Sequence, residues 1–120
     1  MPFGISKQFT FSASHRLDGL GPDHKCGRLH GHNYVVELTL SVGTDALSEV
    51  GFVRDYGDLK DFSRWLDAEL DHRHLNDIVS FNPTAENLCR WLFERWASRY
   101  PELSAVRVSE TVKTWAEYRP

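Results

Sequence analysis

Two segments in which apolar and polar residues alternate constrain the fold of this chain more than any other feature. One segment ends in a histidine and the other begins with one. From Ile5 to His15 the odd positions are mostly apolar and the even positions are serine, threonine or glutamine. From His30 to Val42 the apolar residues occupy the even positions. A period of two predicts strands that bury one face. His15, His30 and His32 all fall on the buried side of this pattern.

Two segments in the middle of the chain carry apolar residues at helical spacing. The first is predicted to begin near Asp55, which suits an N-cap, and its stripe is Leu59, Phe62, Leu66 and Leu70. The second is predicted to open at Asn82, with Pro83 in its first turn, and its stripe is Leu88, Trp91, Leu92 and Trp96. Residues 70–76 form a short polar segment between the two helices.

The chain closes with two further predicted strands. One face of the first carries Val106, Val108, Glu110 and Val112, which places a carboxylate among apolar neighbours. A short strand follows near residues 115–118. The order ββααββ favours an α+β fold with an antiparallel four-stranded sheet and two helices on one face. We expect a single domain over residues 1–120, and its unpaired sheet edges favour an oligomer.

Composition narrows the functional classes. With 120 residues and a formal charge of −3, the chain has no basic surplus that would suit nucleic acid or an anionic membrane. Two cysteines, Cys26 and Cys89, are too few for a disulfide scaffold. No apolar run is long enough to span a bilayer, and the first residues lack signal-peptide features. We therefore expect a soluble, cytoplasmic protein whose partners are neither nucleic acid nor membrane.

The three inward-facing histidines predict a metal site. If the first two strands pair antiparallel, His15 comes opposite His30 and His32, and three imidazoles with one open position are typical of catalytic zinc. Copper, nickel and iron also accept imidazole, so residue type does not fix the metal. Three hydrogen-bonded core histidines are the alternative. A cupin-like site would need Glu37, which lies on the opposite strand face.

Cys26 lies in the loop between the first two strands, close to the predicted metal and to Lys25 and Arg28. Positive surroundings favour a thiolate, which could serve as a catalytic base or as a fourth zinc ligand in a structural site. Cys89, inside the second predicted helix, is expected to pack in the core.

Other candidates for acid–base or binding roles lie further along the chain. Asp71 and His72 suit an orienting pair, although a histidine there could instead cap a helix. Glu110 requires a partner, which could be a cationic or amide-rich ligand or an internal arginine. Thr84 and Ala85 begin the second helix, where capping accounts for the sequence but free N–H groups could also meet a ligand.

Five short motifs follow one another along the chain: Phe11–Arg16 (FSASHR), Cys26–Asn33 (CGRLHGHN), Leu70–Arg73 (LDHR), Pro83–Asn87 (PTAEN) and Glu110–Thr111 (ET). In this order they resemble the 6-pyruvoyltetrahydropterin synthase family over nearly the whole chain. The three residues between the cysteine and His-Gly-His resemble its bacterial 6-carboxy-5,6,7,8-tetrahydropterin synthase branch, because pyruvoyl-forming animal members have a longer spacer.

The resemblance implies a tunnelling fold, in which ββααββ units join their sheets in a trimeric barrel. Two such trimers commonly stack, so the implied assembly is a homohexamer. Zinc is the implied cofactor, and His15, His30 and His32 match its ligands. Thr84 and Ala85 match positions whose backbone lines the pterin pocket, with Ala85 standing where animal members have threonine.

The resemblance also implies catalytic roles. Cys26 matches the cysteine that abstracts a proton, and Asp71 with His72 matches the relay that activates it across a subunit interface. Glu110 matches the residue that binds the pterin's N–H edge and joins the proton relay.

The implied enzyme is a zinc-dependent lyase that acts on a small-molecule pterin triphosphate. It would convert 7,8-dihydroneopterin triphosphate to 6-carboxy-5,6,7,8-tetrahydropterin, acetaldehyde and triphosphate, in queuosine or 7-deazapurine biosynthesis. Two alternatives remain open. One is the sister reaction, which gives 6-pyruvoyltetrahydropterin without carbon–carbon cleavage. The other is a non-catalytic zinc-binding module with Cys26 as the fourth ligand.

Overall fold

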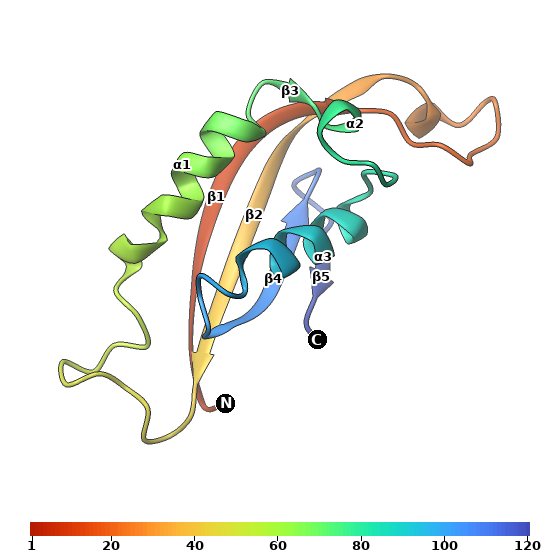
Figure 1. Cartoon of the computed structure of the whole chain (residues 1–120). Helices are drawn as coiled ribbons and strands as arrows, with labels where there is room; N and C mark the ends of the chain where they lie inside the picture. The colour runs from red at the N-terminus through yellow and green to blue at the C-terminus, as the bar shows by residue number, and fades with distance from the viewer.

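The computed structural model describes residues 1–120 and is organised around one long hairpin (Figure 1). Its strands, β1 (Phe3–His15) and β2 (His30–Val42), contain 13 residues each and pair antiparallel. Along both strands the apolar side chains are buried and their neighbours are more exposed, as Phe9 and Phe11 illustrate. The alternation predicted for both segments is therefore confirmed.

Three shorter strands complete a sheet with the order β3-β1-β2-β4-β5. β4 (Leu103–Ser109) pairs antiparallel with β2, and β5 (Ala116–Tyr118) pairs antiparallel with β4. β3 (Arg73–His74) pairs in parallel with β1 through only two residue pairs. The predicted four-stranded antiparallel sheet is therefore wrong, because the sheet is five-stranded and mixed. A strand of two residues carries no alternation that could reveal it in the sequence.

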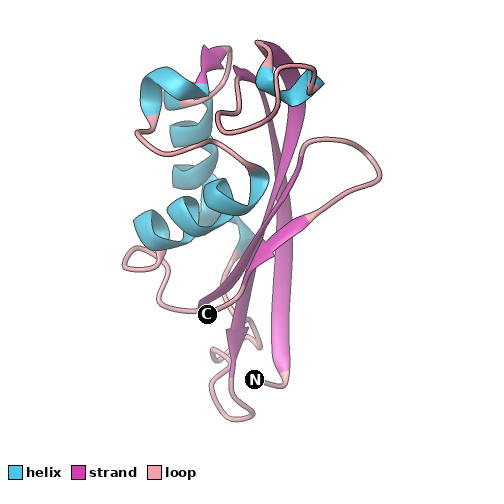
Figure 2. Cartoon of the chain, turned by 90° about the vertical axis from the view of Figure 1, so that its right-hand side faces the viewer, coloured by secondary structure: helices cyan, strands magenta, loops and turns pink.

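Both predicted helices form, and they cover the same face of the sheet (Figure 2). They are α1 (Lys60–Glu69) and α3 (Ala85–Trp96), and Phe62, Leu66, Leu88 and Leu92 are their buried stripe residues. Three short helical turns complete the chain: η1 (Lys25–Gly27), η2 (Tyr56–Leu59) and α2 (Leu75–Ile78).

The two helices begin differently from the prediction. Asp55 caps η2, a 3-10 turn that directly precedes α1, rather than α1 itself. Thr84 is the N-cap of α3, and its hydroxyl accepts a hydrogen bond from the Asn87 N–H at 3.1 Å. Pro83 therefore lies before the helix and not in its first turn, which leaves its carbonyl group free to bond elsewhere.

A core of 19 buried residues lies between the helices and the sheet. Phe62 of α1 packs against Phe9 of β1 and Trp96 of α3, with ring centroids 5.0 and 5.2 Å apart. Truncating such a buried ring to alanine costs about 3–5 kcal/mol, so this contact fixes the helices against the hairpin. Cys89 is fully buried, as predicted, and burial raises the pKa of its thiol to about 12.

The end of β4 differs from the prediction as well. The strand stops at Ser109, and Val112 is 95% exposed, so the apolar face does not continue to Val112. Glu110 follows the last residue of the strand and is half-buried. Its side chain therefore stands at the edge of the sheet rather than within a strand face.

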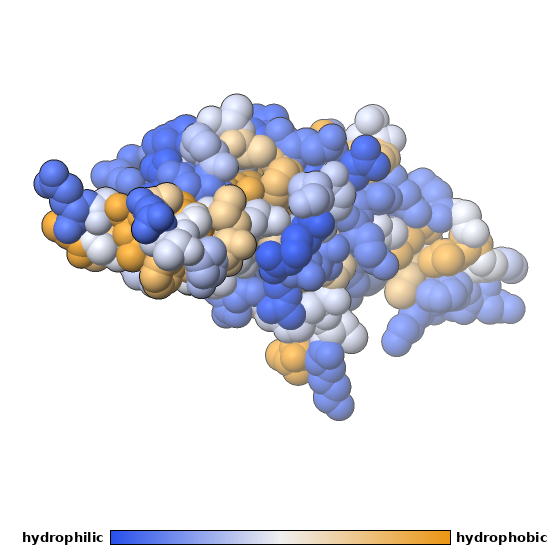
Figure 3. Space-filling view, turned by 90° about the horizontal axis from the view of Figure 1, so that it is seen from below, coloured by the Kyte–Doolittle hydropathy of each residue, from blue (hydrophilic) through white to orange (hydrophobic).

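The molecule measures 55 × 25 × 25 Å, and its outer surface is mixed. The face seen in Figure 3 carries hydrophobic patches separated by hydrophilic side chains, and the exposed apolar residues of the chain include Phe3, Val50 and Phe52. No helix is both long enough and apolar enough to cross a membrane.

Candidate metal centre and adjoining cavity

The register of the hairpin brings three histidines together. His15 stands directly opposite His30, and His32 stands opposite Ala13, two residues before His15. Because residues two apart share a face of a strand, the three imidazoles project to the same side. One ring nitrogen from each lies within 4.8 Å of the others. The sequence predicted this convergence, and the register produces it.

Backbone carbonyl groups orient two of the three rings. His15 Nδ1–H donates to the carbonyl oxygen of Pro83 at 2.8 Å, and His30 Nδ1–H donates to that of Arg28 at 2.6 Å. A neutral imidazole has one N–H, so both Nε2 atoms carry lone pairs. These two Nε2 atoms lie 2.9 Å apart. Two lone pairs at that distance repel each other unless a cation lies between them.

The third ring completes the set. His32 Nε2 is buried and has no hydrogen-bond partner, while the nearest carboxylate oxygen, Oε2 of Glu110, lies 3.7 Å away. Burial lowers the pKa of both His15 and His32, which favours the neutral form that binds metal. Three neutral imidazoles, two held by carbonyl groups in the manner of metal ligands, fit a divalent ion such as zinc.

Two other ligand sets considered from the sequence are not assembled. Glu37 lies beside Arg107 across the β2–β4 pair and binds its guanidinium at 2.8 Å, so it takes no part in the histidine group. Cys26 is likewise outside that group. The arrangement is therefore a three-nitrogen site, without the cysteine that a four-ligand structural site would use.

A cavity of about 580 Å³ is connected to the three histidines through Glu110. It unites four of the predicted site residues, Cys26, Thr84, Ala85 and Glu110, which come from three distant parts of the chain. Glu110 joins the two features, because it lines the cavity and also approaches His32. The remaining lining is largely apolar and includes Leu17, Leu20, Val108 and Trp115. Such a cavity suits a flat organic molecule with polar groups at its edges.

The loop that carries Cys26 is tied to the rest of the chain by asparagine side chains. Asn76 bonds both the N–H and the carbonyl oxygen of Arg16, each at 2.8 Å. Asn82 does the same for Asp18, at 2.9 and 3.1 Å. These paired bonds continue the pairing of β1 beyond its last residue. They fix the path of the chain where it leaves the three-histidine group.

Asp71 and His72 lie beside β1, directly before β3, and neither lines the cavity that contains Cys26. Asp71 accepts a hydrogen bond from the Ser12 N–H at 2.8 Å and contacts His72 Nδ1 at 2.9 Å. These two bonds hold the pKa of its carboxyl group below the ordinary value. His72 has a backbone φ of 59° and a side chain that is 83% exposed. The predicted Asp71–His72 pair thus exists, but within a single chain it does not contact Cys26.

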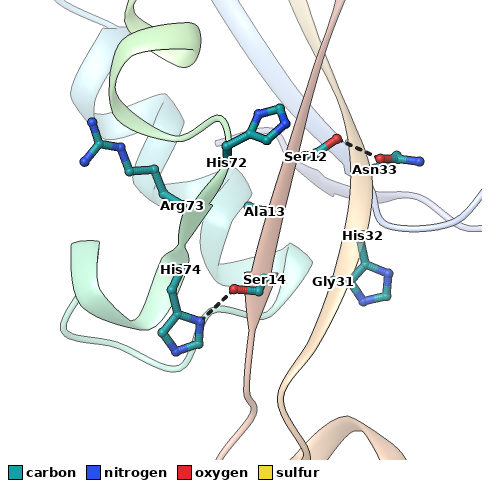
Figure 4. Close-up of a pocket in the computed structure, with 9 residues that line it drawn as sticks. All are labelled: Ser12, Ala13, Ser14, Gly31, His32, Asn33, His72, Arg73 and His74. Atoms are coloured by element: carbon teal, nitrogen blue, oxygen red, sulfur yellow. Dashed lines mark hydrogen bonds between the residues drawn. The ribbon is translucent and has the colours of Figure 1, made fainter.

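Figure 4 shows this second region, a cavity of about 490 Å³ at the outer face of the hairpin. The His72 ring lies to one side of β1 and His32 to the other. Serine and asparagine side chains line the floor between them, and His74 bonds Ser14 at 2.9 Å. The outer cavity is open, so groups from outside the chain can reach His72.

Several residues that shape the site were not found from the sequence. The carbonyl groups of Pro83 and Arg28 carry no side-chain signal, and only the fold brings Pro83 to within 2.8 Å of His15. Asn82 was interpreted only as the start of a helix. The sequence assigned no role to His24, whose ring accepts a hydrogen bond from the Cys26 N–H at 3.1 Å.

Comparison with known proteins agrees with this geometry. Residues 4–120 match the sequence model of a family described as 6-pyruvoyl tetrahydropterin synthase. A relative from Archaeoglobus fulgidus, which carries the name 6-carboxy-5,6,7,8-tetrahydropterin synthase provisionally, is 39% identical over 119 residues, covering 99% of this chain and 96% of the relative. The Aquifex aeolicus 6-carboxy-5,6,7,8-tetrahydropterin synthase is 33% identical, covering 99% of both chains. The solved 6-pyruvoyl tetrahydropterin synthase of Caenorhabditis elegans superposes with a TM-score of 0.82 at 30% identity, over 98% of this chain and 95% of that one.

Proposed function

The chain belongs to the 6-pyruvoyl tetrahydropterin synthase family, and from that premise we propose that it forms 6-carboxy-5,6,7,8-tetrahydropterin from 7,8-dihydroneopterin triphosphate. Acetaldehyde and triphosphate are the other products, and one water is consumed. The observation that carries the proposal is that Glu110, which lines the same cavity as Cys26, also lies 3.7 Å from His32 of the three-histidine group. The names of the Archaeoglobus and Aquifex relatives support this reaction over its sister.

Zinc is the proposed cofactor, with His15, His30 and His32 as its ligands. When bound, it would supply Lewis acidity that makes the C–H bonds beside the substrate's hydroxyl groups easier to ionise. The carbonyl groups that fix two of the rings, together with the low pKa of His15, keep the ligands neutral. We place the reaction in the cytoplasm, in queuosine or 7-deazapurine biosynthesis.

Cys26 is the proposed base for the substrate's side chain. Its thiolate would take a proton from carbon, and loss of triphosphate followed by addition of water would release the outer two carbons as acetaldehyde. Arg16, Lys25 and Arg28 belong to the same loop and are exposed, so they are available to the triphosphate. Thr84 and Ala85 line the cavity at the start of α3 and would meet the bicyclic ring.

A neighbouring subunit completes the proposed site. Asp71 and His72 form a bonded pair, but neither lines the cavity that contains Cys26, and His72 lines the outer cavity instead. As a proton relay for Cys26 they must therefore serve another copy. β1 has a partner strand on its outer side only at Ala13 and Ser14, which leaves an open edge for a second sheet. We propose a homohexamer built from two trimers, with the relay of one subunit beside Cys26 of the next.

Product analysis tests the reaction. Incubated with 7,8-dihydroneopterin triphosphate, the zinc-loaded protein is expected to release acetaldehyde and triphosphate in equal amounts, together with a carboxylated pterin of matching mass. Triphosphate without acetaldehyde would reassign the chain to the pyruvoyl-forming reaction. A fully metal-loaded protein that yields neither product would refute the proposed function.

Glu110 provides a test of pterin recognition. A carboxylate can accept two hydrogen bonds from the N–H edge of a pterin, and Glu110→Gln replaces one acceptor with a donor. A buried mismatch of this kind costs about 1–3 kcal/mol, so pterin affinity is expected to fall by about 5- to 150-fold. Fluorescence titration with 6-carboxytetrahydropterin measures the affinity. Zinc content should not change, because Glu110 is not one of the three ligands; unchanged pterin affinity would show a purely structural role.

A further inference from the structure

Cys26 is held by backbone hydrogen bonds rather than by packing. It lies in η1, a turn of three residues that contains no buried residue. Its N–H donates to Nδ1 of His24 at 3.1 Å, and its carbonyl oxygen accepts from the Leu17 N–H at 3.0 Å. A segment with few apolar contacts opens easily. The position of the thiol therefore depends on hydrogen bonds, among which the bond to His24 is the one made by a side chain.

His24 has the geometry of an N-cap. Its backbone is extended, with φ −77° and ψ 122°, its carbonyl oxygen accepts from the Gly27 N–H at 3.0 Å, and its ring takes the place that an asparagine or aspartate oxygen usually occupies. Because Nδ1 accepts, the ring proton of the neutral imidazole is on Nε2. The ring also lines the cavity that holds Cys26 and Glu110.

We propose that His24 is a positioning residue for Cys26: its Nδ1 caps the Cys26 N–H and thereby fixes the direction of the thiol in the cavity. The proposal rests on the proposed function, in which Cys26 is the base. Proton removal from carbon requires the acceptor at a defined place, and a displacement of about 1 Å can cost about a hundredfold in rate. Because η1 buries no residue, only backbone hydrogen bonds such as that from the Leu17 N–H to the Cys26 carbonyl oxygen would hold the turn if the cap were lost.

Two substitutions at position 24 separate capping from other roles of the imidazole. His24→Ala removes the acceptor. His24→Asn keeps one, because Oδ1 of asparagine is as many bonds from the backbone as Nδ1 of histidine. We expect kcat to fall about tenfold in His24→Ala, with KM changed less than about threefold, because Cys26 acts in the chemical step. In His24→Asn, kcat should return to within about threefold of the unmodified protein.

Amide hydrogen exchange provides a readout independent of turnover. The Cys26 amide should exchange about fivefold faster in His24→Ala and at the original rate in His24→Asn. Asp23→Ala is the matched control, since Asp23 is exposed in the same loop and its side chain makes no hydrogen bond; it should leave both exchange and kcat unchanged.

Three results would overturn the proposal: an unchanged Cys26 amide in His24→Ala, an unchanged kcat in that variant, or an asparagine variant as impaired as the alanine variant. Failure of the proposed function would look different, because the unmodified protein itself would then show no turnover. The exchange measurement would still establish whether His24 holds Cys26.

Discussion

Cys26→Ala is expected to abolish turnover while zinc stays bound and the fold survives. Removing a general base costs about 10²–10⁴ in rate, and no second thiolate can substitute, since burial raises the pKa of Cys89 to about 12. Metal should remain at one ion per chain because the three histidines converge without Cys26. Folding should survive because η1 buries no side chain. Steady-state kinetics, metal analysis and circular dichroism measure the three quantities.

The same substitution separates the enzyme from a structural zinc module. If Cys26 were a fourth ligand, Cys26→Ala would lose zinc and stability together. Cys26→Ser is the matched control, because it preserves size and polarity but supplies a far weaker base. Both variants should be inactive and fully metal-loaded, and metal loss in either would contradict the assignment of Cys26 as the base.

His32→Ala is expected to remove most of the bound metal and nearly all activity. His32 Nε2 is buried and has no hydrogen-bond partner, so its removal takes away a ligand and breaks no hydrogen bond within the chain. The sheet should stay folded, which circular dichroism can verify. Metal content after dialysis is the decisive measurement, since two imidazoles and water bind zinc much more weakly than three imidazoles.

His74→Ala supplies the matched histidine control. His74 forms a hydrogen bond with Ser14 on the outer face of the hairpin and is not part of the three-histidine group. It should keep one metal ion per chain. Full metal content in His32→Ala would refute the three-histidine assignment, and equal metal loss in both variants would point to a general loss of structure.

Much of the site could be predicted from the alternation of apolar and polar residues along the first two strands. The alternation places His15 at an odd position and His30 and His32 at even positions, on the buried faces of their strands. Antiparallel pairing of the strands then brings the three imidazoles together. The apolar faces of the two helices could be predicted as well, because residues such as Phe62 and Leu66 recur at helical spacing, and both are buried. In each case the repeat spans enough residues for its period to be recognised.

The features that could not be predicted depend on contacts between distant backbone groups. β3 contains two residues, and it forms because Asp71 and His72 bond Ser12 far away in the chain. The prediction that Glu110 and Val112 lie on a strand face assumed that the alternation continues past Ser109. In the structure β4 ends at Ser109 and the chain turns there. Pro83 suited a first helical turn, but Thr84 provides the cap one residue later. Local propensity cannot choose between such neighbouring positions.

The pairing of β1 with β2 has a consequence for how sequences of this kind can change in length. One residue added to either strand between its core residues and its histidine would turn that histidine to the other side of the sheet, so strand insertions should be tolerated only in pairs. The loop from Arg16 to Leu29 is free of this constraint, because His15 and His30 face each other whatever its length. Length variation among homologues should therefore accumulate in that loop, while the two strands keep their residue count.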